Sequence, residues 1–226
     1  MCGRYSFALT EGQVHEHFMN VEIAQVWRTS YNIAPTQHAF VITNNQPQKL
    51  QYLAWGLVPY WSNSGKNKGR LINARMEGIE SKPSFRMPIR QRRCLVLADS
   101  YYEWKLYGTQ KRPYRILLKN QPLMVMAGIW DSWDKDGYSV KTFSIITAPA
   151  NDDVGHIHSR MPVILDTKEK QAEWLGDISL TKTKSLLSSL QNGLLKSYPV
   201  TPKVNATNYD EPDIHVEIQE LPDLFS

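Results

Sequence analysis

Cysteine is scarce in this sequence of 226 residues, which contains only Cys2 and Cys94. Two thiols do not make the disulfide framework of a small secreted domain, so a reducing cytoplasm is the expected compartment. Long apolar runs are also missing. No stretch approaches the roughly 20 residues of a membrane span, and the first residues lack the charged-then-apolar pattern of a secretory signal. We therefore expect a cytoplasmic protein with no membrane partner.

Linkers and repeats are lacking as well. No repeated, low-complexity or Pro/Gly-rich segment divides the chain, and its length suits one well-filled core. Apolar residues make up 42% of the sequence and aromatic residues 11%, as in ordinary globular proteins. The sequence therefore predicts a single domain over residues 1–226.

The net charge of +4 is small but unevenly distributed. Residues 66–93 contain nine lysines and arginines against two glutamates, which gives +7. From 209 to 226 there are six acids and no lysine or arginine, which gives −6. A basic middle with an acidic tail suggests a polyanionic partner on one face, although solvated charge scattered around a domain would give the same counts.

Short β-forming runs dominate the pattern. We expect strands at 38–43, 49–57, 94–98, 114–118, 123–129 and 138–147, with turns at Tyr107-Gly108 and Lys135-Asp136-Gly137. Helical patterns occur at 10–19, where Thr10 is the expected N-cap, and at 82–92, 167–175 and 181–191. The last eighty residues predict two helices followed by returning strands. Short antiparallel strands with interspersed helices indicate one α+β domain dominated by sheet.

The chain begins Met1-Cys2-Gly3-Arg4-Tyr5. Because Cys2 is small, the initiator methionine can be trimmed to leave cysteine at the mature N-terminus. An α-amine, which titrates near pH ~7.7, would then lie on the carbon next to the one that bears the thiol. Such a β-aminothiol condenses with aldehydes, because the amine forms an imine and the sulfur then closes a thiazolidine ring. The alternative is a buried second residue that packs like a small apolar group.

An aromatic turn follows the second predicted strand. Pro59 turns the chain and places Tyr60 and Trp61 beside the basic segment, where large rings are often partly exposed. Flat rings next to cations suit the stacking of unpaired bases, at ~1–3 kcal/mol each. The alternative is that these rings form the rim of the core.

Asn73 and Arg75 are two residues apart on an extended segment, so they point to the same side. Asparagine offers a donor and an acceptor, and arginine binds phosphate through two parallel hydrogen bonds. An asparagine at the end of a strand is more often only a backbone cap.

Glu103 lies between Tyr102 and Trp104 at the end of a predicted strand. A carboxylate among rings loses solvation, which raises its pKa and lets it exchange protons near neutral pH. Alternation places Glu103 on the face opposite both rings, however, so a solvent-exposed carboxylate is slightly favoured from the sequence alone.

His156 and His158 form a His-x-His pattern that two metal ligands on one strand would show. Further ligands are missing nearby, so we expect no metal and no other cofactor. A single histidine that moves protons, with Arg160 on an anion, is the better functional interpretation.

Together these segments resemble the SRAP family, the SOS-response-associated peptidase-like proteins that capture abasic DNA. The matching motifs span residues 2–205 in the family's order: Cys2-Gly3-Arg4-Tyr5, Asn32-Ile33-Ala34-Pro35, Trp55-Gly56-Leu57-Val58-Pro59, Asn73-Ala74-Arg75, Glu103-Trp104-Lys105 and His158-Ser159-Arg160-Met161-Pro162. The acidic tail at 209–226 matches no motif. The resemblance implies a single domain with an antiparallel, barrel-like sheet core flanked by several helices.

The resemblance also implies residue roles. Cys2 would crosslink to the ring-opened sugar of an abasic site in single-stranded DNA through a thiazolidine, Asn73 would hold the open sugar, and Glu103 and His158 would move protons. This chemistry includes Schiff-base, lyase-type strand cleavage and reversal of the adduct. DNA contacts are expected from Arg4, Asn32, Pro35, Trp61, Arg75, Arg86 and Arg160. We expect a monomer.

Two other functions remain open. A thiol peptidase limited to self-processing would use Cys2 as its nucleophile and His158 as the base, with Asn73 or Glu103 as the orienting group. It has no use for a basic, aromatic-lined channel. A noncatalytic single-strand binder would keep that channel but has no need for a terminal cysteine.

Overall fold

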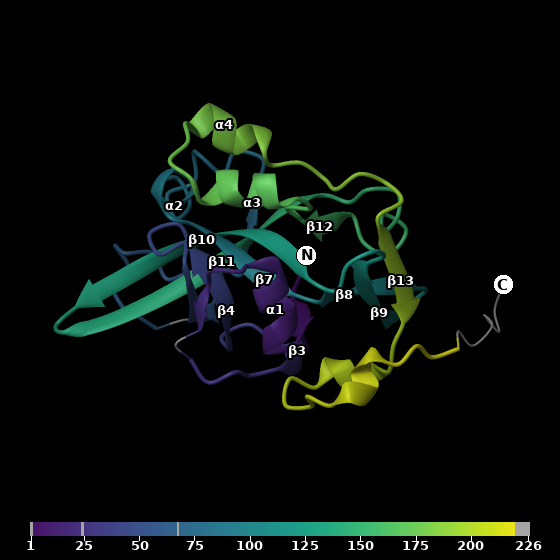
Figure 1. Cartoon of the computed structure of the whole chain (residues 1–226). Helices are drawn as coiled ribbons and strands as arrows, with labels where there is room; N and C mark the ends of the chain where they lie inside the picture. Colours follow the sequence, from purple (N-terminus) through teal and green to yellow (C-terminus); the bar gives the residue numbers. More distant parts are fainter. Residues whose placement is uncertain (1, 24, 67, 220–226) are drawn as a thin grey trace.

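The computed structural model describes residues 2–23, 25–66 and 68–219, and two β-sheets in it share one apolar core (Figure 1). Met1, which the expected maturation removes, and residues 220–226 of the acidic tail lie outside the described residues. Among the described residues there are four short α-helices: α1 (Glu11–His17), α2 (Pro88–Gln91), α3 (Lys168–Leu175) and α4 (Leu180–Ser185).

The first sheet closes into a barrel of five strands: β11 (Tyr138–Pro149), β10 (Met124–Lys135), β7 (Arg93–Ala98), β4 (His38–Thr43) and β5 (Lys49–Trp55). Neighbours along this order are antiparallel, and β5 closes the ring by pairing in parallel with β11. The α+β, barrel-like fold predicted from the sequence is confirmed, with one parallel junction in place of a wholly antiparallel barrel.

Three short strands extend this sheet: β2 (Glu22–Ile23) beside β5, and β6 (Asn73–Arg75) and β12 (Arg160–Pro162), which both pair with β11. Strand β6 runs parallel to β11, with Asn73 opposite Ile145. The segment with Asn73 and the segment that starts at Arg160 are thus both held against the same barrel strand.

The second sheet has the order β13 (Leu195–Pro199), β9 (Gln110–Leu118), β8 (Ser100–Tyr107), β1 (Arg4–Phe7) and β3 (Ser30–Ile33). Strand β1 pairs antiparallel with both neighbours, so that Tyr5 lies opposite Tyr101 on one side and Ile33 on the other. The ring of Tyr5 contacts Trp55 of the barrel edge-on, with centroids 5.0 Å apart. This buried aromatic pair packs the second sheet against the barrel.

Residues 200–218, here called the C-terminal strap, cross the outer face of the second sheet. Two 3₁₀ turns, η1 (Pro202–Asn205) and η2 (Pro212–His215), shape the strap. Val200, Val204 and Ile214 form a small apolar cluster around Tyr102 of β8. The expected returning strands at the chain end are therefore one strand, β13, followed by this strap.

Side chains from β1 and β3 hold the strap in place. The carboxamide Nδ2 of Asn32 donates to the carbonyl oxygens of Val204, Ala206 and Tyr209, at 3.3, 3.0 and 2.6 Å. Arg4 donates through Nη1 to Asn32 Oδ1 at 2.7 Å and to the Val204 carbonyl at 2.6 Å. Both side chains are buried, so these bonds satisfy polar groups that water does not reach.

Two expected helices are shorter than predicted. In the segment 82–92 the chain turns at Lys82 but is helical only from Pro88, because proline at that position has no N–H to continue the ladder begun by Phe85 and Arg86. The segment 181–191 ends its helix at Ser185, and Ser189 instead donates its hydroxyl to the Pro149 carbonyl at 2.6 Å. Helix α1 begins after Thr10, which forms the predicted N-cap.

The substitution Asn32→Ala should lower the free energy of unfolding by about 2 kcal/mol, because it removes the carboxamide's hydrogen bonds to three strap carbonyls and the side-chain acceptor of buried Arg4. Urea denaturation would measure the change, and Asn120→Ala, at an exposed turn, is the matched control. Equal stability of the Asn32 variant and wild type would show that the strap is not held by this side chain.

Candidate active site

Cys2 lies just before β1, and its side chain is fully buried. The thiol Sγ contacts the carbonyl oxygen of Arg4 at 3.9 Å. Burial raises the pKa of the Cys2 thiol, and the negative charge of Glu103 raises it further. The sulfur is therefore held as a neutral thiol beside a carboxyl group.

Asn73 fixes the backbone of Cys2. Its Nδ2 donates to the Cys2 carbonyl oxygen at 2.7 Å. Because Asn73 belongs to β6 of the barrel and Cys2 precedes β1 of the second sheet, this bond crosses between the two sheets. Asn73 thus caps a backbone carbonyl, as the alternative interpretation of the sequence expected. The carbonyl that it caps belongs to Cys2, the proposed nucleophile.

Glu103 points inward, contrary to the exposed carboxylate that the sequence slightly favoured. The strap covers the outer face of β8, which carries Tyr102 and Trp104, so alternation turns Glu103 into the molecule with 3% of its surface exposed. Burial raises the pKa of Glu103, and nearby His158 partly opposes that shift. The carboxyl group can therefore hold a proton at a higher pH than an exposed glutamate.

His158 comes from the loop between β11 and β12. Its Nδ1 lies 3.9 Å from Oε1 of Glu103 and accepts the backbone N–H of Arg160 at 3.0 Å. In the neutral tautomer that accepts this bond the ring proton lies on Nε2, whereas in the other tautomer Nδ1–H can donate to the Arg160 carbonyl oxygen, which lies 3.3 Å away. Nδ1 of the ring thus faces Glu103, and the imidazole is also partly exposed to solvent.

Arg160 forms a bidentate ion pair with Glu77, at 2.6 and 2.9 Å, and also donates to the Thr147 carbonyl at 2.6 Å. Its guanidinium is thus held on the β11 edge, next to the segment that carries Asn73. Arg75 and Arg86 are exposed and available to solvent, and Pro35 is half-buried in a turn. The predicted DNA contacts of Arg160, Arg75, Arg86 and Pro35 stay predictions.

The expected DNA contacts of Arg4 and Asn32 also stay predictions, but both side chains face inward. Their polar atoms form hydrogen bonds with each other and with the strap instead of pointing into solvent. Their direct effect in this structure is to hold the strap, and through it the outer face of β8.

Trp61 is exposed over 53% of its surface and Tyr60 over 55%, as an aromatic recognition turn requires. Trp61 lines a groove of about 540 Å³ together with Pro59, Lys66, Lys68 and Arg70. The predicted juxtaposition of flat rings and cations is therefore present in the loop between β5 and β6, here called the Trp61 loop.

The supports of the Trp61 loop were not foreseen from the sequence. Buried Asp131 accepts the backbone N–H of Tyr60 at 3.0 Å and pairs with Arg92 at 3.1 Å. Trp133 donates from Nε1 to the Ser62 carbonyl at 2.7 Å, and its ring lies so close to Gly65 that a Cβ there would be 2.4 Å away. No local pattern could reveal these partners, because they lie about 70 residues away on the β10–β11 hairpin.

His156 and His158 do not converge. His156 is exposed and lines a different groove, whereas His158 faces Glu103. In the part of the chain that the structure describes, no three histidine, cysteine, aspartate or glutamate side chains are grouped as metal ligands. No described helix has the length and apolar character needed to cross a membrane.

A buried thiol at the start of the chain, a carboxamide on its backbone, and a carboxyl–imidazole pair form a candidate nucleophile site built on a closed barrel. Residues 1–207 match the family model described as SOS response associated peptidase (SRAP). The chain belongs to this family.

Characterised relatives cover most of the chain. The abasic site processing protein YoqW of Bacillus subtilis (strain 168) is 36% identical over 221 residues, which cover 95% of this chain and 98% of that protein. The abasic site processing protein HMCES of Gallus gallus is 32% identical over 228 residues, which cover 85% of this chain and 67% of that protein. A crystal structure of a protein from Bacteroides thetaiotaomicron superposes with a TM-score of 0.87 at 30% identity, over 96% of this chain and 100% of that one.

Glu103→Gln should stabilise the folded protein near neutral pH by on the order of 1 kcal/mol. The pKa of Glu103 is raised in the folded state, so the stability that its protonated form contributes is present in acid and is lost as pH rises through the folded-state pKa. Glutamine keeps the neutral form at every pH.

Urea unfolding of the two proteins at a series of pH values would test this difference. We expect equal stabilities in acid and a growing advantage of the variant toward neutral pH. Glu16→Gln, on the exposed face of α1, should show no such divergence. A variant that is less stable than wild type at neutral pH would contradict the assignment.

Proposed function

We propose that this protein processes abasic sites in single-stranded DNA by capturing the ring-opened sugar aldehyde covalently at Cys2. The observation that carries the proposal is the convergence of Cys2, Asn73, Glu103 and His158 from four separate segments. The names of the relatives, abasic site processing proteins, support the same substrate. The protein would act in the cytoplasm as a monomer.

The reaction requires removal of Met1, which frees the α-amine of Cys2. The amine attacks the aldehyde carbon to give a carbinolamine, which loses water to form an imine. Sγ then bonds to the same carbon while the imine nitrogen takes up a proton, and a five-membered thiazolidine results. The sum is one aldehyde plus one aminothiol giving one thiazolidine and one water, with no oxidant or reductant.

Asn73 would position the reactants. Its hydrogen bond holds the Cys2 carbonyl and thereby restricts where the adjacent amine can point. Its Oδ1 is buried and has no hydrogen-bond partner among the described residues, so it is left to accept from a hydroxyl of the open sugar. This is the role that the family resemblance implies for Asn73.

Glu103 would serve both proton transfers. A carboxyl group with a raised pKa can protonate the departing hydroxyl of the carbinolamine, and the resulting carboxylate can take the proton of the thiol as sulfur attacks. The thiol needs such help because its own raised pKa keeps it neutral. One group thus gives a proton and later regains one.

His158 would act on the sugar side of the site. With Nδ1 accepting from the Arg160 backbone, the ring can donate from Nε2 to the sugar ring oxygen during opening to the aldehyde. The other neutral tautomer, in which Nδ1 donates to the Arg160 carbonyl oxygen at 3.3 Å and Nε2 carries no proton, can assist phosphate loss from the imine, the lyase-type reaction, because Nε2 can then take a proton from the carbon next to the imine carbon. Arg160 would steady the departing phosphate.

Unpaired DNA is the substrate form that the Trp61 loop favours. The exposed rings of Tyr60 and Trp61 can stack on bases only where those bases are not paired, and Lys66, Lys68 and Arg70 border the same groove. Arg75 and Arg86 would add phosphate contacts, with Pro35 against the sugar–phosphate chain. Arg4 and Asn32 would contribute there by holding the strap and β1.

Thiol peptidase activity is the less favoured alternative. A peptidase nucleophile needs a thiolate, but burial and the charge of Glu103 both raise the pKa of Cys2. In the described part of the chain, the hydrogen-bond contact of Sγ is with a backbone carbonyl rather than with the imidazole of His158. Self-processing would then be limited to the loss of Met1.

Cys2→Ser should abolish heat-stable adduct with an oligonucleotide that contains one abasic site. Serine keeps the α-amine and can form a transient imine, but its hydroxyl does not make the stable sulfur ring. A denaturing gel without added reductant would show a slow-migrating band for wild type only, and intact-mass analysis would show loss of Met1. Cys94→Ser, at the other buried cysteine, is the matched control. If Cys2→Ser formed as much heat-stable adduct as wild type, the thiazolidine mechanism would be wrong.

Glu103→Gln and His158→Gln should separate the two proton paths, and each should slow its step by about 10²–10⁴. Glu103→Gln should slow adduct formation and its exchange onto a competing abasic oligonucleotide alike, because one catalyst serves both directions. His158→Gln should form the adduct but cut strand scission or reversal more strongly. Time courses of adduct formation, adduct exchange and strand scission would distinguish the two roles. Wild-type rates throughout for either variant would remove that residue from the mechanism.

A further inference from the structure

The β8–β9 hairpin continues the active-site face beyond Glu103. Glu103, Lys105 and Tyr107 alternate onto one face of β8, and their partners on β9 are Tyr114, Arg112 and Gln110. The buried carboxyl group of Glu103 and the cations toward the tip of the hairpin therefore belong to the same face of the sheet. Residues 104–113 contain three lysines and arginines and no acid.

Aromatic rings and cations interleave on this surface. Nζ of Lys105 lies 4.8 Å from the ring centroid of Tyr107 and 6.0 Å from that of Tyr114. The guanidinium of Arg112 lies 4.4 Å from the Tyr107 centroid, and the two tyrosine hydroxyls are 2.8 Å apart. The cations are thus held in fixed positions over the rings rather than spread into solvent.

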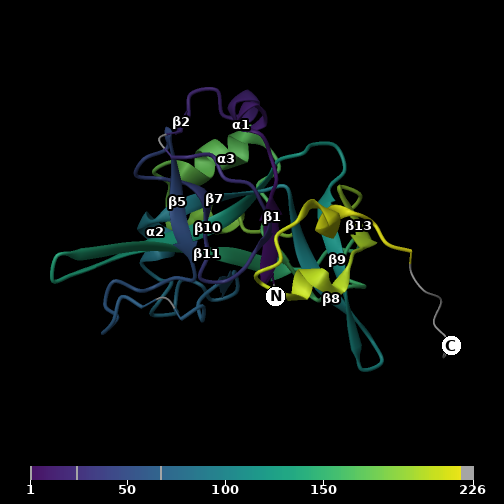
Figure 2. The same cartoon turned by 90° about the horizontal axis from the view of Figure 1, so that it is seen from below.

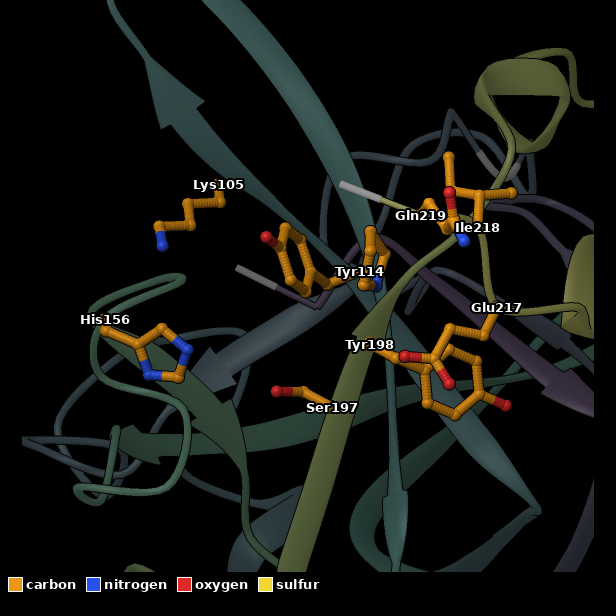
Figure 3. A pocket seen from close by; sticks show the side chains of 9 residues that line it. Lys105, Tyr114, His156, Ser197, Tyr198, Glu217, Ile218 and Gln219 are labelled. Carbon is orange, nitrogen blue, oxygen red and sulfur yellow. The ribbon is translucent and has the colours of Figure 1, made fainter. Parts of the chain in front are cut away.

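A groove of about 650 Å³ lies beside this surface. Lys105 and Tyr114 form one wall, and His156 faces them from the loop that also carries His158 (Figure 3). Tyr198 of β13 and the described end of the strap, with Glu217, close the far side. The groove therefore lies next to the candidate active site, since its wall residue Tyr114 is the cross-strand partner of Glu103.

The start of β1 lies between the Trp61 loop and the β8–β9 hairpin (Figure 2). A lesion inside a DNA strand necessarily has nucleotides on both sides. The Trp61 loop offers a basic, aromatic surface for one flank only. The hairpin offers a second such surface on the opposite side of the proposed nucleophile.

We propose that the groove along the β8–β9 hairpin is a second single-strand subsite, which binds the nucleotides on the side of the abasic site opposite to the Trp61 loop. Lys105 and Arg112 contact phosphates, and Tyr107 and His156 contact bases or sugars. This inference rests on the proposed function, since it takes the abasic nucleotide to lie at Cys2.

Binding to oligonucleotides with a single flank would test the subsite. Each oligonucleotide carries a tetrahydrofuran abasic analogue, which cannot crosslink, at its 5′ end or its 3′ end, so that unpaired nucleotides extend to one side only. The variant Lys105→Gln/Arg112→Gln, here called the groove variant, removes two charges from the hairpin: Lys105 in the groove wall and its cross-strand partner Arg112 beside it. Lys135→Gln/Lys168→Gln removes two exposed charges elsewhere and is the matched control.

The groove variant should bind one of the two oligonucleotides roughly tenfold more weakly, with a salt slope reduced by about 0.7 for each lost phosphate contact. Trp61→Ala should weaken binding of the other oligonucleotide. The charge-conserving variant Lys105→Arg/Arg112→Lys should restore the salt slope. Unchanged binding of the second oligonucleotide also shows that the groove variant is folded.

Three results would overturn the subsite: equal losses for both oligonucleotides, no loss beyond that of the control variant, or weakening of the same oligonucleotide by Trp61→Ala and the groove variant. Crosslinking of wild type to true abasic oligonucleotides, measured in parallel, tests the proposed function separately. A protein that shows the flank asymmetry but forms no adduct would keep the subsite and lose the covalent mechanism.

Discussion

The hydrogen bond from Asn73 to the Cys2 carbonyl joins the barrel to the second sheet at the point where the proposed chemistry occurs. Asn73 is fixed by the parallel pairing of β6 with β11, and Cys2 by the position of β1 between β3 and β8. The site geometry therefore depends on how the two sheets pack. The buried contact between Tyr5 and Trp55 fixes that packing close to Cys2. A residue at a chain end, usually the least ordered place in a protein, is held here from both sides.

The C-terminal strap determines which way the side chains of β8 face. By covering Tyr102 and Trp104 it makes the outer face of β8 a second small core, and Glu103 is consequently directed inward. Arg4 and Asn32 hold this cover from β1 and β3. The strap thus influences the proton chemistry of a carboxyl group that it does not touch, because it fixes the alternation of the strand that carries it.

Local structure was largely predictable from the sequence. The strands at 38–43 and 94–98, the turn at Lys135-Asp136-Gly137 and the N-cap at Thr10 depend on nearby residues, and the structure has them. The inward orientation of Glu103 was not predictable, because it depends on a strap about 100 residues further along the chain. The internal partners of Arg4 and Asn32 were missed for the same reason. The motifs named the residues of the site, but only the packing shows which way they point.

The burial of Cys2 also affects how well its thiol resists oxidation before the protein meets a lesion. Peroxides and other oxidants react with thiolates that solvent can reach, whereas Cys2 is fully buried and its raised pKa keeps it protonated. In the proposed mechanism the sulfur closes the thiazolidine ring, so oxidation of Cys2 to sulfenic acid before a lesion is met would prevent capture. The buried, protonated thiol is therefore shielded from oxidants in solution, and in the proposed mechanism it reacts only after an aldehyde has bonded to the neighbouring amine.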